Sequence, residues 1–296
     1  MTNPGLSRRG GCALVIAATV LGAVASSPAQ TKQYTVSGMV LRVDSSRRSF
    51  LVSHDAVPGL MAAMTMSFDV GDAKELAGVQ PGNAVTFTLV VGQQSLRAER
   101  VRVVPYLSVE QDPLTARRLA LLKSLASAPK PLPVGQTVPD FTLTDQTRRQ
   151  VRLSQFRGKV VALNFIYTSC ALPQFCYRVA NHFGVVQRRF RREAGREVVF
   201  LTVTFDPVRD TPEKLAEYAT QWNADPDIWH FLTGAAADVR RVCNIFGVDF
   251  FPDEGLMNHS IRTAVIDRQG TLVANIEGNQ YSATQLGDLV ETTLKR

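Results

Sequence analysis

Cysteine is scarce in this chain of 296 residues, which contains four cysteines in all. So few cysteines exclude a small secreted protein that is held together mainly by disulfide bonds. Cys12 lies in the N-terminal segment, whereas Cys170, Cys176 and Cys243 lie in the second half of the chain. Cys170 and Cys176 are close enough in sequence to pair, which leaves Cys243 as the odd cysteine. The pair is therefore a candidate for metal binding or for redox chemistry.

The chain also lacks an apolar run long enough to span a membrane. Residues 12–25 are apolar, but this run is shorter than the ~20 residues that a spanning helix needs. Arg8 and Arg9 precede it, and small residues suited to cleavage follow at Ala25 and Ala29. The pattern predicts a signal peptide over residues 1–29 and a periplasmic or otherwise extracytoplasmic protein. If this signal is not cleaved, it anchors the protein to the membrane.

Charge of one sign is not concentrated anywhere, although the formal net charge is +7. The basic residues are spread along the chain apart from a cluster at residues 188–196, which is typical of the solvated face of a helix. This distribution excludes nucleic-acid binding as the function. An exposed basic patch would instead favour encounter with acidic proteins or with a membrane surface.

Residues 33–105 have the periodicity of short strands. Val85, Phe87 and Leu89 alternate with threonines, which predicts a half-buried strand over residues 84–91. Four further strands are predicted at residues 34–43, 49–54, 64–70 and 96–104. Five short strands without an obvious helix indicate a small all-β, OB-like barrel, because closure removes exposed sheet edges.

A different pattern follows a linker at residues 106–133, which combines a predicted helix at 111–127 with a proline-rich end. From residue 134 to 296, apolar strands alternate with amphipathic helices, which indicates an α/β domain with a parallel or mixed sheet. The strand at 160–166 is apolar throughout, as expected of a strand that is covered on both faces. Thr211 and Ser282 are predicted to cap two of the helices.

The cysteine pair follows the strand at 160–166 and precedes a predicted helix at 177–192. The partial positive charge of a helix N-terminus stabilises thiolate, which is both a nucleophile and a metal ligand. Thiolate together with imidazole suits copper or zinc. A buried or merely disulfide-linked pair is the structural alternative.

Five motifs in this region resemble the Sco/SenC family of thioredoxin-fold copper chaperones. They are GQTVPDF at 135–141, FIYTSC at 165–170, FDPVRDTP at 205–212, WHFLTG at 229–234 and NHS at 258–260. The resemblance implies a thioredoxin-like fold over residues 134–296 and one copper ion bound by Cys170, Cys176 and His259. It also implies that Asp206 lies close to the metal, although a role in a turn at the end of a strand is equally compatible with its position.

The spacing of the cysteines departs from the family pattern, in which three residues separate them. Here five residues intervene, so on a continuous helix the two thiols would diverge by roughly 240°. We therefore expect an enlarged loop that lets Cys176 fold back towards Cys170. The long spacing gives a thiol–disulfide role additional weight.

A second group of soft ligands lies in the predicted barrel. Met64 and Met66 are two apart on one predicted strand, so their side chains share a face, and His54 ends the preceding strand. Two thioethers and one imidazole suit Cu(I), whereas methionines that simply fill the core are the alternative. The string at 58–68 resembles the CusF-type copper-binding domain, which implies Cu(I) or Ag(I) bound by these three residues. Met61 or a neighbour replaces the tryptophan that often covers the metal in that family, either as a ligand or as packing.

Together these observations predict an exported copper metallochaperone that handles Cu(I) or Cu(II). The barrel would capture Cu(I), and the thioredoxin-like domain would pass copper to a receiving protein. The Sco resemblance suggests a cytochrome c oxidase subunit as the receiver and a thiol reductant protein as a second partner. The alternatives are a thiol:disulfide oxidoreductase, in which Cys170 and Cys176 are catalytic and act on an exported copper protein, and a copper-sequestering protein.

Overall fold

The computed structural model describes residues 1, 31–92, 95–106, 130–170, 173–253 and 256–296. The expected signal peptide beyond its first residue and the predicted helix at 111–127 lie outside the described residues. Residues 31–296 belong to one structural unit, which contains a barrel and an α/β domain. Within the described part of the chain, none of the helices combines the length and the apolar character that crossing a membrane requires.

The N-terminal part of this unit is a closed barrel with the strand order β1-β2-β3-β5-β4. Its strands are β1 (Lys32–Asp44), β2 (Ser49–His54), β3 (Met64–Val70), β4 (Ala84–Val91) and β5 (Leu96–Val103), with a short 3-10 helix at Ala73–Leu76. All pairs are antiparallel except β3 with β5. Phe50, Phe68 and Phe87 pack against one another in its core. The predicted closed barrel is therefore confirmed. The prediction was possible because the alternation of apolar and polar residues defines one buried face on each strand.

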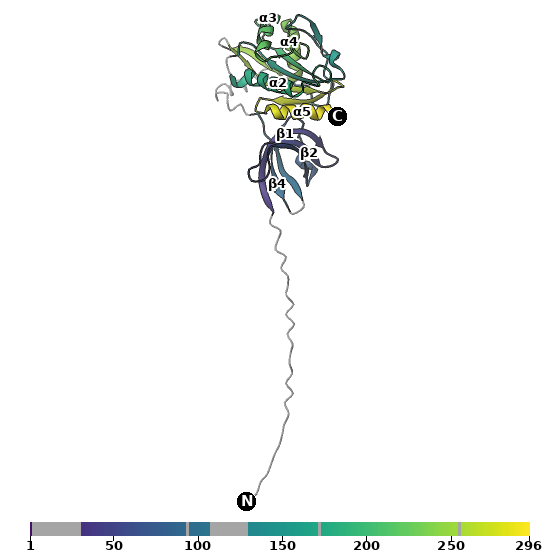
Figure 1. Cartoon of the computed structure of the whole chain (residues 1–296), viewed down its shortest axis with the longest axis vertical. Helices are drawn as coiled ribbons and strands as arrows, with labels where there is room; N and C mark the ends of the chain where they lie inside the picture. Colours follow the sequence, from purple (N-terminus) through teal and green to yellow (C-terminus); the bar gives the residue numbers. More distant parts are fainter. Residues whose placement is uncertain (2–30, 93–94, 107–129, 171–172, 254–255) are drawn as a thin grey trace. The chain divides into compact units, whose positions relative to one another are not determined.

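Strand β1, which is labelled in Figure 1, contributes side chains to two hydrophobic cores. Val36 and Val40 lie in the barrel core, whereas Met39 and Leu41 lie in the core of the α/β domain. Successive side chains of a strand point to opposite faces, and here both faces are covered. The barrel is thereby joined to the second domain through apolar packing.

The α/β domain is built on a seven-stranded sheet with the order β14-β13-β8-β9-β10-β6-β7. The strands are β6 (Thr142–Asp145), β7 (Gln150–Arg152), β8 (Val160–Ile166), β9 (Val198–Thr204), β10 (Trp229–Thr233), β13 (Arg262–Ile266) and β14 (Leu272–Glu277), and a separate hairpin is formed by β11 (Phe250–Asp253) and β12 (Leu256–His259). The neighbouring strands β8, β9 and β10 are parallel and fully buried, and the remaining pairs are antiparallel. The expected mixed α/β sheet is confirmed.

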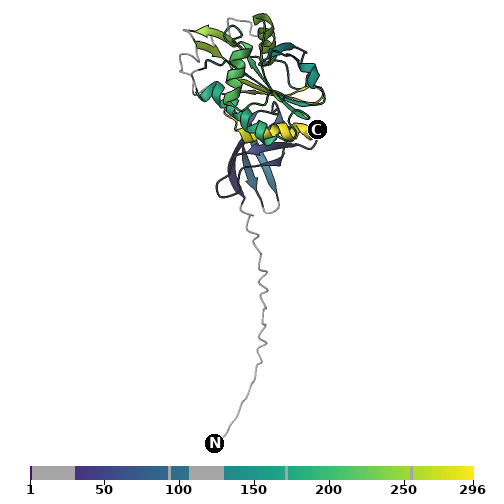
Figure 2. The ribbon, with the colours of Figure 1, turned by 45° about the horizontal axis from the view of Figure 1, so that its top comes forward.

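Four described helices cover this sheet. They are α2 (Arg178–Arg189), α3 (Pro212–Gln221), α4 (Ala236–Phe246) and α5 (Ala283–Leu294), with a 3-10 helix at Leu153–Phe156 and a π-helical turn, η3, at Pro173–Tyr177. The predicted caps are present: Thr211 accepts from the backbone of Lys214, and Ser282 forms a capping box with Gln285. Helix α5, yellow in Figure 2, contacts α2 and β8 on one side and the barrel strands β1 and β2 on the other.

Gly38 allows β1 to approach β2 closely at His54. A β-carbon at this position would lie 2.5 Å from the backbone oxygen of Ser53 and 2.7 Å from the α-carbon of His54. Both contacts are with backbone atoms, which cannot move without disturbing the β1–β2 ladder. The strand pairing at the end of β2 therefore depends on glycine at position 38.

We expect Gly38→Ala to destabilise the protein by about 1–3 kcal/mol, the usual cost of overpacking a close contact. Gly71→Ala is the matched control, because its β-carbon would meet only the Arg97 side chain, at an ordinary 3.6 Å. The control should unfold within about 0.5 kcal/mol of the original protein. Urea denaturation measures both variants, and equal stabilities would contradict the expected clash.

Candidate metal sites

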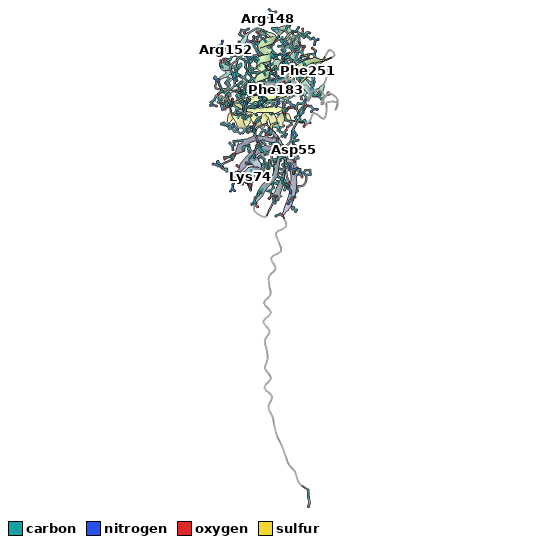
Figure 3. All side chains as sticks on the ribbon, turned by 180° about the vertical axis from the view of Figure 1, so that it is seen from behind. Asp55, Lys74, Arg148, Arg152, Phe183 and Phe251 are labelled. Carbon is teal, nitrogen blue, oxygen red and sulfur yellow. The ribbon has the colours of Figure 1, made fainter. Side chains whose placement is uncertain are left out.

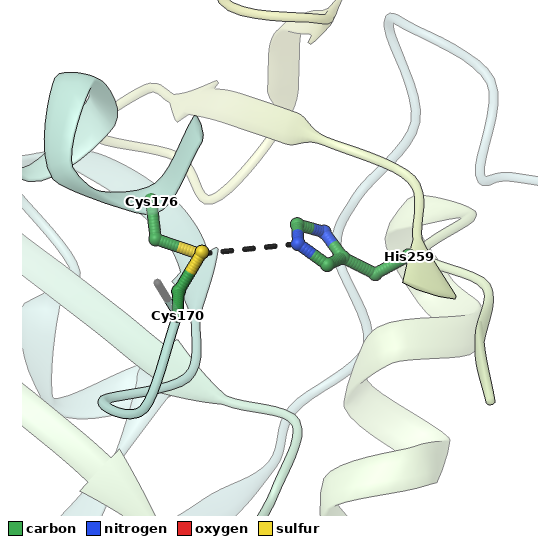
Figure 4. Close-up of side chains that lie close together, drawn as sticks. All are labelled: Cys170, Cys176 and His259. Carbon is green, nitrogen blue, oxygen red and sulfur yellow. Dashed lines mark hydrogen bonds between the residues drawn. The ribbon is translucent and has the colours of Figure 1, made fainter. Parts of the chain in front are cut away.

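Cys170, Cys176 and His259 converge on one point in the α/β domain (Figure 4). Their ligand atoms all lie within 4.8 Å of one another. Cys170 follows β8, Cys176 lies in the η3 turn, and His259 ends β12, so two segments about eighty residues apart in the chain meet here. Cys170 and His259 are half-buried, and only 3% of Cys176 is exposed. Two thiols and an imidazole at this separation form a donor set suited to a soft metal ion.

The η3 turn accounts for the unusual cysteine spacing. We expected Cys176 to fold back towards Cys170 from an enlarged loop. The two sulfurs do lie within 4.8 Å of each other, but Cys176 lies in a π-helical turn that leads directly into α2 and not in a loop. A π turn closes its hydrogen bonds over five residues rather than four, so it places side chains differently from an α-helix. The rotation of 240° expected for a continuous α-helix therefore does not apply to this pair.

His259 is oriented for coordination through its Nε2 atom. Its Nδ1 atom lies 3.1 Å from the backbone oxygen of Ser260, and its Nε2 atom lies 3.9 Å from the sulfur of Cys176. A carbonyl oxygen only accepts, so Nδ1 carries the proton and Nε2 keeps its lone pair. The rings of Tyr167 and Phe205 pack against the imidazole, with centroid distances of 5.7 and 4.6 Å. This arrangement, common in metal sites, fixes both the tautomer and the plane of the ring.

The electrostatic environment keeps the Cys176 thiol protonated in the absence of metal. A hydrogen bond with the Cys170 side chain, followed by burial, raises the pKa of Cys176 well above its ordinary value of 9.0. The positive end of a helix would stabilise thiolate, but at Cys176 these two effects outweigh it. A metal ion would displace the proton, because thiolate rather than thiol is the ligand.

Asp210 positions the turn that carries Cys170. This fully buried carboxylate accepts hydrogen bonds from the backbone and side chain of Thr168 and from the side chain of Thr204. Burial raises the pKa of Asp210, and the hydrogen bonds from the two threonines only partly oppose that effect. Sequence reasoning missed this residue, although it lies in the FDPVRDTP motif.

Asp206, the acidic residue that was expected near the metal, does not belong to the described cluster of ligand atoms. Its carboxylate instead lies 3.3 Å from the guanidinium of Arg209, and its backbone nitrogen donates to the side chain of Thr204. These contacts are those of a turn that follows β9.

Asn279 holds the turn that carries Cys176. Its buried side-chain amide donates to the backbone oxygen of Gln174, which lies in η3. The loop before α5 is thereby linked to the turn that carries Cys176. The motifs gave no signal for this contact, because more than a hundred residues separate its partners along the chain.

The three candidate ligands of the barrel are also neighbours. In the β2–β3 ladder His54 stands directly opposite Met64, and Val52 stands opposite Met66. Opposite residues of an antiparallel pair share a face, so His54, Met64 and Met66 lie on the same side of the ladder. Met64 is 50% exposed, whereas Met66 and Met61 are half-buried and pack against the barrel core.

His54 has the same orientation as His259. Its Nδ1 atom lies 2.7 Å from the backbone oxygen of Asp55, so Nδ1 carries the proton. Its Nε2 atom is buried and has no hydrogen-bond partner among the described residues. A buried nitrogen without a partner is costly in an ordinary core, and a soft metal ion between Nε2 and the methionines would satisfy it.

Cys243, His182 and His230 lie outside both groups of ligands. Cys243 is fully buried on α4, where burial raises the pKa of its thiol to about 12. His230 bonds to the buried Asp145 at 3.2 Å, and His182 packs against Tyr281.

Two family models match this chain. The model described as SCO1/SenC matches residues 130–294, and the model described as copper binding periplasmic protein CusF matches residues 33–102. The SCO1 protein homolog of Bacillus subtilis is 29% identical over 102 residues, which are 34% of this chain and 51% of that protein. The chain spans about half the length of the relatives that it matches first.

Solved Sco structures are similar to the α/β part. Arabidopsis thaliana ScoI with copper bound is 23% identical, with a TM-score of 0.48, and the match covers 54% of this chain and 100% of that one. BsSco, a member of the Sco family of cytochrome c oxidase assembly proteins, is 22% identical, with a TM-score of 0.47 and coverage of 57% and 99%.

Copper is the metal named in the description of the CusF family. Since the SCO1/SenC match covers more than half of the chain, this protein belongs to the SCO1/SenC family of copper-binding proteins, with a CusF-type, OB-like barrel preceding its thioredoxin-like domain.

Proposed function

We propose that this protein is an extracytoplasmic copper metallochaperone with two copper sites. Cys170, Cys176 and His259 would hold copper in the thioredoxin-like domain, and His54, Met64 and Met66 would hold Cu(I) in the barrel. The observation that carries the proposal is the convergence of two sulfurs and one imidazole nitrogen within 4.8 Å. Export is supported by the N-terminal signal pattern and by the match to a family described as periplasmic.

The two donor sets suit different steps of copper handling. Thioethers need no deprotonation, so the barrel would take up Cu(I) with little dependence on pH apart from its histidine. Thiolates bind soft metal ions more strongly than thioethers, so copper would move from the barrel to the cysteine site. The cysteine site would then pass copper to a receiving protein. The family association with cytochrome c oxidase assembly makes an oxidase subunit our proposed receiver.

A thiol:disulfide oxidoreductase is the second candidate, because the two thiols are close together and Cys170 is partly accessible. The environment of Cys176 argues against it. A buried thiol with a raised pKa is a weak nucleophile at neutral pH, so Cys170 would have to begin any exchange. The orientation of His259, with Nδ1 bonded to a backbone oxygen and Nε2 facing the sulfur of Cys176, is that of a metal ligand. Metal binding is therefore the better-supported function.

The first prediction concerns copper stoichiometry. The reduced protein should bind two Cu(I) ions in competition with a chromophoric chelator, and Cys170→Ser/Cys176→Ser should bind one. Met64→Leu/Met66→Leu should also bind one, because leucine conserves the volume but lacks the sulfur.

Matched controls exist for both pairs. Cys243→Ser removes a buried cysteine outside the cluster. Met39→Leu removes a buried methionine from the face of β1 that packs in the core of the α/β domain. Both should still bind two ions. Two ions bound by either double variant would refute the ligand assignment for that site.

The second prediction concerns the direction of transfer. In the full chain, the cysteine site (isolated by Met64→Leu/Met66→Leu) should bind Cu(I) more tightly than the barrel site (isolated by Cys170→Ser/Cys176→Ser). The reason is the stronger bond of thiolate to Cu(I). Chelator competition at one pH measures both affinities, and a tighter barrel would reverse the proposed direction.

The third prediction concerns the pH dependence of thiol reactivity without metal. Because the pKa of Cys176 is raised, its thiolate fraction should stay small at neutral pH and keep growing beyond pH 9.0. Alkylation followed by mass spectrometry should therefore modify Cys170 first at pH 7, and the rate at Cys176 should still rise above pH 9. In the denatured protein both should react alike. Rapid modification of Cys176 at pH 7 in the folded protein would contradict the raised pKa.

A further inference from the structure

We propose that helix α5 of the thioredoxin-like domain positions the copper ligands of the barrel through Gln285 and Asp288. This inference rests on the proposed barrel site and extends it. It makes the two side chains positioning residues, since neither belongs to the ligand set. The barrel site would then have its full affinity only while the barrel is docked on α5.

The ligands and the anchored residues alternate along the two strands. His54, Met64 and Met66 lie on one face of the β2–β3 ladder, Ser53 and Thr65 occupy intervening positions, and Asp55 follows the end of β2. Adjacent residues of a strand point to opposite faces. Each ligand therefore has a chain neighbour on the outer face, which is the face that meets α5.

A single carboxylate oxygen connects both strands to the helix. Ser53 and Thr65 are directly opposite each other in the ladder, and both donate to Oδ2 of Asp288, at 2.7 and 2.9 Å. Ser53 precedes His54, and Thr65 separates the two methionines. The bridge therefore fixes β2 relative to β3 one residue away from all three ligands.

Gln285 adds a second attachment, at the end of β2. Its side-chain nitrogen lies 3.4 Å from the backbone oxygen of Ser53 and 3.3 Å from the carboxylate of Asp55. These two residues flank His54. Figure 3 labels Asp55 where the barrel meets the yellow helix. The backbone on both sides of the imidazole is thus held by one side chain.

The anchoring groups are themselves immobilised. The side-chain oxygen of Gln285 accepts from the backbone of Ser282 in the capping box of α5, at 2.9 Å. The other carboxylate oxygen of Asp288 lies 2.7 Å from the guanidinium of Arg189 on α2. Because Gln285 and Asp288 are held in this way, their hydrogen bonds can fix the positions of β2 and β3.

The barrel site needs such support because of its place in the ladder. His54 is the last residue of β2, and Met64 is the first residue of β3. The ends of secondary structure elements fray, since fewer hydrogen bonds hold them. Attachments at Ser53, Asp55 and Thr65 restrain this end, where His54 and Met64 must keep their separation to share one ion.

The test uses the full chain carrying Cys170→Ser/Cys176→Ser, in which only the barrel binds copper. Adding Asp288→Ala should weaken Cu(I) binding by about 10-fold, as is usual when a group that orients metal ligands is lost. X-ray absorption should show fewer sulfur neighbours per copper ion. Glu291→Ala is the matched control, because Glu291 pairs with the same Arg189 and otherwise with Lys295, whereas Asp288 bonds to the barrel. It should keep the affinity and the sulfur count.

Two further variants separate positioning from general stability. Asp288→Asn keeps an oxygen that can accept from Ser53 and Thr65, so it should restore most of the affinity. Thr65→Val removes one hydroxyl of an exposed residue and should weaken binding less than Asp288→Ala, with an unchanged melting temperature of the copper-free protein.

The outcomes distinguish this inference from the proposed function. If the parent variant binds no Cu(I), the barrel site itself is wrong. If the parent binds one ion and Asp288→Ala binds it equally well with the same sulfur count, the barrel site stands and the positioning role of α5 is refuted. Equal weakening by Glu291→Ala would likewise refute it, because the effect would then come from the loss of charge around Arg189.

Discussion

A hydrogen bond between a histidine Nδ1 atom and the backbone oxygen of the next residue sets the chemistry of both candidate sites. His54 makes this bond to Asp55, and His259 makes it to Ser260. In each case the proton is fixed on Nδ1, and the Nε2 lone pair is left on the side of the sulfur atoms, where it could be donated to a metal ion. Without that bond either nitrogen could carry the proton, and the ring could turn away from the sulfur atoms. The same local device thus recurs in both candidate sites.

Both sites are assembled at the ends of structural elements and depend on residues that do not bind metal. Asp210 holds the turn after β8, and Asn279 holds the turn that precedes α2. Asp288 bridges the two strands of the barrel that carry the ligands. Element ends let ligands from distant parts of the chain converge, but they are also the least rigid parts of a fold. The supporting hydrogen bonds compensate for this, and they connect the thioredoxin-like domain to both sites.

Much of the fold was predictable because its signals are local. The five barrel strands were expected within two residues of their observed ends, since alternation of apolar and polar side chains marks each one. Thr211 and Ser282 marked the starts of α3 and α5 through short-range hydrogen bonds. The π turn at Cys176 was not predicted, because its hydrogen-bond pattern leaves no periodicity in a five-residue segment. The β11–β12 hairpin that carries His259 was also not predicted.

The sequence by itself determined which soft ligands are present, that they form two groups, and that one group lies in a barrel and the other beside a buried strand. These properties follow from residue type and from periodicity over a few residues. Only the tertiary structure decided that the widely spaced thiols meet, that Asp210 rather than Asp206 supports the turn before Cys170, and that α5 contacts the strands of the barrel site. The physical reason is that the supporting contacts depend on how whole elements pack. Thr168 with Asp210, Cys176 with His259 and Ser53 with Asp288 join residues from about forty to more than two hundred positions apart.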